Sequence, residues 1–125
     1  MEKKIFDLHA ENTELLKNLD FYKDEMKVMQ KRIEEITTKN SSKEILMKVE
    51  HFQNQLIIQH NNLDELRHNV NTNESQIQKN INSNPTASDH RKMEDHVKER
   101  EDVVSFENHL NELRKELNEF LAKTL

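Results

Sequence analysis

The chain has 125 residues, a formal net charge of −5, one proline, and no glycine or cysteine. The missing glycines exclude the usual phosphate-binding loops and nucleophile elbows, because these need positive φ angles or close backbone approach. The missing cysteines exclude disulfides and thiolate metal sites, and the acidic charge predicts that nucleic acid is not a partner.

The hydropathy pattern gives no sign of a membrane or secretory segment. No apolar run approaches the roughly 20 residues of a membrane span. The first residues of the chain are mostly charged, and no apolar signal core follows them. We therefore expect a cytoplasmic protein with no membrane insertion.

The first predicted element is a helix over about residues 2–38. Its apolar residues alternate between spacings of four and three, which is the heptad pattern of a helix that packs along one seam. Asn12 is the only polar member other than a tyrosine. The seam consists of Met1, Ile5, Leu8, Asn12, Leu15, Leu19, Tyr22, Met26, Met29, Ile33 and Ile36.

The second predicted helix covers about residues 42–81, after a loop at 39–41. Ser41, followed three residues later by Glu44, predicts a capping box at its start. The heptad spacing continues, but amide side chains interrupt it. The seam consists of Ile45, Val49, Phe52, Leu56, Gln59, Leu63, Leu66, Val70, Asn73, Ile77 and Asn80.

The third predicted helix covers about residues 88–123, after a loop at 82–87 that contains Pro85. Upstream of its seam, Met93 and Val97 form a stripe that joins the seam only through a slip of one residue near Arg100. We expect a core defect or a local change of supercoil there. The seam itself consists of Val103, Phe106, Leu110, Leu113, Leu117 and Phe120.

These elements predict an all-α fold, a long antiparallel up-down-up three-helix bundle with coiled-coil packing, as one domain over residues 1–125. Short connections favour antiparallel neighbours, which supports this topology. The alternative is a helical hairpin whose core is completed by the third helix through homodimerisation.

Counting residues outward from the two predicted turns places certain polar residues at the same height in the bundle. Asn12, Asn69 and Arg100 coincide, which predicts a buried polar layer that fixes the register of the helices. A small ligand or anion site is the alternative for this layer. The same count pairs Tyr22 with Gln59, since a buried phenol needs a hydrogen-bond partner.

Several apolar residues, Met47 among them, lie off the seams. Four of these are at similar heights on the first two helices: Phe21, Val28, Ile57 and Ile58. One interpretation is that the third helix covers them, because a three-helix core needs a wider apolar stripe than a simple seam. The other is an exposed patch for homodimerisation or for binding a protein partner.

Among the seven histidines, one arrangement has the spacing of a surface metal site. His60, Asp64 and His68 are four residues apart and share one helical stripe, so adjacent pairs could chelate a divalent ion. The alternative is a solvated helix face with ordinary histidines. Acidic residues occur near histidines no more often than the composition predicts.

No nucleophile–base pair or glycine-rich loop points to catalysis, and we expect neither an enzyme nor a cofactor. The sequence predicts a non-enzymatic helical-bundle protein that acts through protein–protein interaction or self-assembly, as an adaptor, spacer or scaffold. Its partner would be another protein or a second copy. The alternative function is a bundle that responds to a metal or small ligand through its surface histidines.

Overall fold

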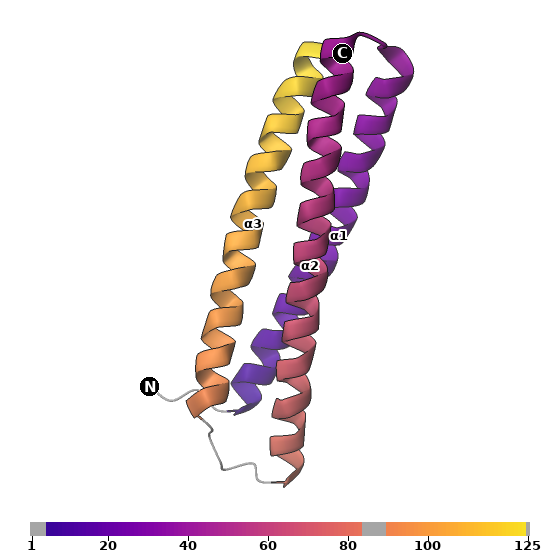
Figure 1. Ribbon diagram of the computed structural model, residues 1–125. Coiled ribbons are helices and arrows are strands. Elements are labelled where there is room, and N and C mark those ends of the chain that lie inside the picture. The colour runs from indigo at the N-terminus through magenta and orange to yellow at the C-terminus, as the bar shows by residue number, and fades with distance from the viewer. Residues whose placement is uncertain (1–4, 84–89, 125) are drawn as a thin grey trace.

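Three long helices make up the part of the chain that the structure describes. The computed structural model describes the backbone of residues 5–83 and 90–124, and the side chains of residues 7–79 and 96–124. The elements are α1 (Ile5–Lys39), α2 (Lys43–Ser83) and α3 (His90–Thr124). α1 and α3 run in the same direction and α2 runs antiparallel to both (Figure 1).

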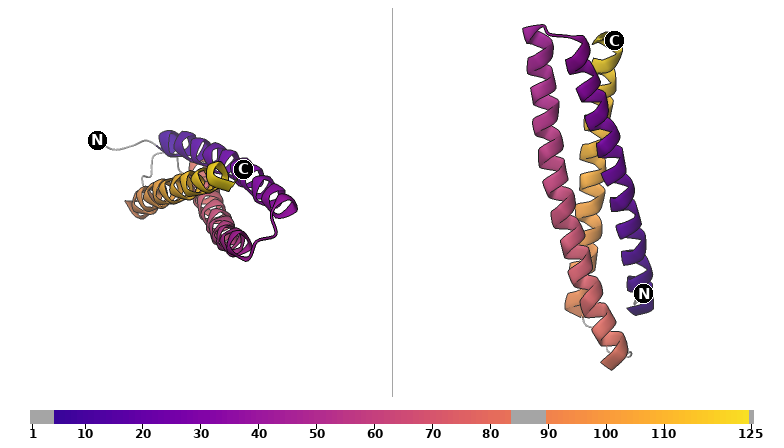
Figure 2. Two further views of the ribbon diagram at one scale, coloured as in Figure 1. Left: turned by 90° about the horizontal axis from the view of Figure 1, so that it is seen from above. Right: turned by 90° about the vertical axis from the view of Figure 1, so that its right-hand side faces the viewer.

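The three helices pack on one another within a single chain, and seen from above they form a triangle (Figure 2). The predicted all-α, up-down-up three-helix bundle is therefore confirmed. The alternative, in which a second chain completes the core of a hairpin, is not needed, because α3 contacts both α1 and α2.

The connection between α1 and α2 differs slightly from its prediction. Ile45 donates its backbone N–H to Oγ of Ser42 at 3.3 Å, so Ser42 rather than Ser41 is the N-cap. This assignment fits a helix that starts at Lys43, because an N-cap side chain accepts from the third helical residue. The predicted start of α3 at residue 88 lies outside the described residues.

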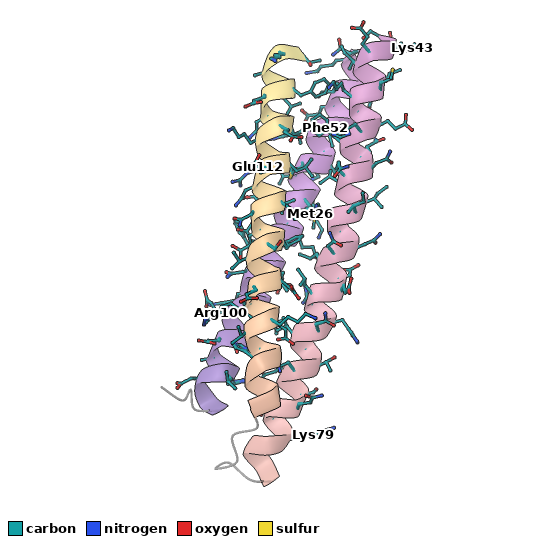
Figure 3. All side chains as sticks on the ribbon, turned by 60° about the vertical axis from the view of Figure 1, so that its left-hand side comes forward. Met26, Lys43, Phe52, Lys79, Arg100 and Glu112 are labelled. Carbon is teal, nitrogen blue, oxygen red and sulfur yellow. The ribbon has the colours of Figure 1, made fainter. Side chains whose placement is uncertain are left out.

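The core follows the predicted seams. Side chains at the heptad positions fill the space between the helices, and Figure 3 shows Met26 and Phe52 among them. Burial of each large apolar side chain contributes up to about 1.5–3 kcal/mol to folding. The most deeply buried apolar residues are Leu19, Ile33, Ile36, Leu63, Val70, Ile77, Val103, Leu110 and Leu117.

The predicted slip in the third seam is wrong. His96 is 1% exposed, while its neighbour Val97 is 51% exposed. His96 lies seven residues before Val103, so the α3 seam continues in register with a polar residue inside and an apolar one outside. Met93 belongs to the part of α3 whose side chains are not described.

Candidate functional site

The polar residue in the α1 seam is buried, but its partner is not the one predicted. Asn12 is fully buried and donates from Nδ2 to Oδ1 of Asn73 and to Oε2 of Glu74, each at 3.0 Å. Asn73 is 4% exposed. Asn69 is an exposed residue. The predicted contact of Asn12 with Asn69 is therefore replaced by a contact with Asn73.

Two histidine–carboxylate contacts flank this amide pair. His9 of α1 bonds Glu74 of α2, and the buried His96 of α3 bonds Glu11 of α1. Arg100, which the sequence predicts in the polar layer, binds Glu11 at 3.0 Å, with its side chain 47% exposed. Arg100 is thus at the rim of the layer and not inside it (Figure 3).

The different partner of Asn12 has a simple geometric cause. Counting from the turn compares the heights of Cα atoms, whereas side chains in a helix tilt toward its N-terminus. In an antiparallel pair, this tilt makes each contacting residue lie about one position later in the chain than the count predicts. The connection also lies slightly later than predicted, because α1 ends at Lys39 and α2 starts at Lys43, which moves the position opposite Asn12 from 69 to 70. With the tilt added, the expected position is about 72, and the nearest seam residue is Asn73.

Tyr22 also contacts a different residue from the one predicted. Its Oη donates to Oε2 of Glu107 on α3 at 3.4 Å, and its ring packs edge-on against Phe106 with centroids 6.0 Å apart. Burial, followed by the charge of Glu107, raises the pKa of Tyr22 above its ordinary value. Gln59 is buried on α2, and its Oε1 accepts no hydrogen bond from the described residues.

The histidine stripe on α2 forms a single contact. His60 Nδ1 lies 3.4 Å from Oδ2 of Asp64, and both side chains are at least half exposed. His68 is exposed as well. Within residues 7–79 and 96–124, no group of three or more histidine or acidic side chains is arranged to hold a metal ion.

The off-seam apolar residues are exposed, so α3 does not cover them. Phe21, Val28, Ile57 and Ile58 have exposed fractions between 47% and 59%. They do not form one patch, however. Ile57 borders the groove between α1 and α2, whereas Phe21 packs edge-on against Tyr22, which faces α3.

A row of side-chain contacts joins α1 to α3 and marks where the exposed α1 residues lie. Phe21 and Val28 are one helical turn before and after Glu25, a residue of this row. They therefore border the surface between α1 and α3. The row consists of Glu11 with Arg100 at 3.0 Å, Tyr22 with Glu107 at 3.4 Å, Glu25 with Arg114 at 3.6 Å, and Arg32 with Asn118 at 3.1 Å.

Two apolar residues of α3 border the same surface. Val97 and Val104 are 51% and 49% exposed, and they lie one turn before and after Arg100. We call this surface, bordered by Phe21, Val28, Val97 and Val104, the α1/α3 face. The sequence-based argument missed its α3 half. The sequence contained a signal for it, because Val97 and Val104 are seven residues apart and so share one heptad position, directly after the seam residues His96 and Val103 in the chain.

The remaining concave features are grooves between neighbouring helices. One groove has a volume of about 650 Å³ and lies near the α1–α2 connection, where Ile45, Met47 and Phe120 line it. A polar groove of about 280 Å³ between α2 and α3 lies beside Asn73. Both are open to solvent along the bundle.

Comparisons with protein-family models, with curated proteins and with solved structures find no match to this chain. No helix in the described part of the chain has an apolar stretch long enough to cross a membrane. The arrangement of side chains on the bundle surface is therefore the basis for a functional proposal.

Proposed function

We propose that this protein is a non-enzymatic helical bundle that acts by binding other proteins, including copies of itself, as an adaptor, spacer or scaffold. The observation that supports this proposal most directly is the α1/α3 face. Its four apolar side chains are about half exposed, although the bundle has a well-formed core in which to bury them. Exposed apolar side chains that flank a row of polar contacts in this way are a common feature of protein interaction sites.

The shape of the molecule supports the same proposal. The helices of 35, 41 and 35 residues extend for about 50–60 Å at 1.5 Å per residue, which presents long faces to a partner. The proposal keeps the expectation of a cytoplasmic protein that does not bind nucleic acid, in keeping with the net charge of −5. It assigns no catalytic residue and no cofactor.

The test is to capture binding proteins with the tagged chain from its source cell. Phe21→Glu places a charge in the α1/α3 face, and Thr13→Glu places the same charge at an exposed position of the same helix. We expect capture of specific proteins, or of a second copy, to be lost in Phe21→Glu and retained in Thr13→Glu. Circular dichroism checks that both variants keep their helices. Equal capture by all three chains would contradict the proposal for this face.

The metal-responsive alternative has less support. The only histidine–carboxylate contact in the predicted triad is that between His60 and Asp64. Side chains four residues apart on an exposed helix face often make such a contact without a metal, so the contact does not favour a metal site. We therefore do not propose this function.

A further inference from the structure

The groove near the α1–α2 connection lies at the end of the bundle where α2 begins and α3 ends (Figure 1). We call it the end groove. Its floor continues the core, because Ile45 and Phe120 are partly buried and pack against the core residues. The ring centroid of Phe120 lies 5.4 Å from that of Phe52. Met47 also lines the end groove and is 62% exposed. The bundle therefore leaves apolar surface uncovered at this end.

Two exposed lysines line opposite walls of the end groove. Lys48 lies one turn before Phe52 on α2, and Lys123 lies about one turn after Phe120 on α3. The two phenylalanines are in contact, and the two helices are antiparallel. Both lysines therefore lie at about the same height, across the groove from each other.

The charges of these lysines are not used within the part of the chain that the structure describes. Neither Lys48 nor Lys123 forms an ion pair there, in contrast to the arginines of the α1/α3 face. Glu44 lines the end groove one turn before Lys48, but it forms no ion pair with it. Lysines thus outnumber acidic residues in the lining by two to one.

We infer that the end groove binds an amphipathic helix of a partner protein, with apolar side chains on the floor and an acidic side chain between Lys48 and Lys123. The groove runs between two antiparallel helices, so a helix laid along it completes a local four-helix arrangement. A carboxylate between the two ammonium groups offsets their mutual repulsion, whereas a basic partner would add to it. The inference rests on protein binding as proposed above but uses a different surface from the α1/α3 face.

The first test asks which peptides the end groove selects. Random peptides of about 16 residues, or roughly 24 Å as a helix, are displayed on phage and selected on three full-length chains. These are the wild type, the groove variant Lys48→Glu with Lys123→Glu, and the control Lys17→Glu with Lys115→Glu. The control makes the same change in net charge at exposed positions outside the groove. Circular dichroism checks that all three chains are equally helical.

We expect one class of peptide to be enriched on the wild type and the control but not on the groove variant. Its members should combine apolar residues at helical spacing with aspartate or glutamate. The absence of such a class would overturn the inference. A class without acidic residues would overturn it as well, because the unpaired lysines are what identify the partner.

The second test separates charge from apolar contact. A synthetic peptide of the enriched class is compared by fluorescence anisotropy with a copy whose acidic residues are changed to amides. The amide copy should bind about ten-fold more weakly at low salt, and the difference should shrink at about 1 M salt because exposed charges are screened. Met47→Glu should weaken binding of both peptides. Equal affinity of the two peptides at low salt, or no effect of Met47→Glu, would overturn the inference.

Light scattering tests the other occupant of the groove, a second copy of the chain. A wild-type dimer that Met47→Glu dissociates would place that copy in the groove and overturn the inference. Phe21→Glu should bind the acidic peptide as the wild type does, because Phe21 borders the α1/α3 face. Failure of the two proposals is therefore distinguishable. Loss of captured proteins in Phe21→Glu, with no acidic peptide bound by the wild type, overturns only the end-groove inference.

Discussion

Asn12 and Asn73 form a buried amide pair across α1 and α2, with Nδ2 of the first donating to Oδ1 of the second at 3.0 Å. The pair is surrounded by the apolar seams on either side along the bundle. A buried hydrogen bond of this kind adds little net stability, but removing one partner leaves the other unsatisfied. The pair therefore disfavours alternative registers, in which each amide would face an apolar side chain.

We expect Asn12→Ala to lower the free energy of unfolding by about 1–3 kcal/mol, because Oδ1 of Asn73 loses its donor in a buried site. Replacing both asparagines by leucine should recover most of this loss, since neither amide is then left unsatisfied and only the partly exposed Glu74 loses a donor. Urea denaturation of the wild type, the single variant and the double variant measures both effects. A double variant as unstable as Asn12→Ala would show that the pair does not act as a unit.

The burial of Asn73 was predictable from the sequence, whereas its contact with Asn12 was not. Heptad spacing places Asn73 in the α2 seam, and the structure buries it there. Choosing Asn69 opposite Asn12 depended on an absolute height along the bundle. The observed partner lies four residues, or about 6 Å along the helix, beyond the predicted one, because the connection lies later than predicted and side chains tilt toward the helix N-terminus.

The beginning of the α3 seam shows a second limit of prediction from the sequence. The sequence-based argument followed the apolar residue Val97 and inferred a slip, but His96 is the buried residue. Heptad phase, carried back from Val103, predicts the correct face without any slip. Its polar environment could not be predicted, because Glu11, which bonds His96, comes from another helix.

Truncating a buried and an exposed apolar side chain of α2 to alanine should change the free energy of unfolding by very different amounts. Leu63 is fully buried, and Leu63→Ala should lower the free energy of unfolding by about 2–5 kcal/mol through lost burial and a cavity. Ile57 is 59% exposed, and Ile57→Ala should cost less than about 1 kcal/mol. Chemical denaturation of both variants gives the comparison. A large loss in Ile57→Ala would mean that a packed partner covers this residue.

Zinc should not stabilise the fold through the α2 histidines. His60 and Asp64 form an exposed two-residue contact, and no third ligand completes a site among the described side chains. We expect the melting temperature to be the same with and without equimolar zinc. The control is His60→Gln with His68→Gln, which removes both predicted ligands. A zinc-induced rise in the wild type that disappears in this variant would support the metal-responsive alternative.

Tyr22 reports on the packing of α1 against α3. It is the only tyrosine and the chain has no tryptophan, so its ionisation can be followed by absorbance near 295 nm without interference. Because burial and the charge of Glu107 raise the pKa of Tyr22, the midpoint should lie above the ordinary value of about 10. Glu107→Gln should lower it, since the repelling charge is removed.

The raised pKa of Tyr22 determines whether stability rises or falls as the pH increases. As the pH rises above about 10, the unfolded chain loses the tyrosine proton before the folded chain does. The contribution of Tyr22 to stability is therefore complete below that pH and is lost as the pH rises through the folded pKa. Urea denaturation at neutral and alkaline pH should show a smaller alkaline loss in Tyr22→Phe than in the wild type. A wild-type midpoint at or below the ordinary value would contradict the contact between Tyr22 and Glu107.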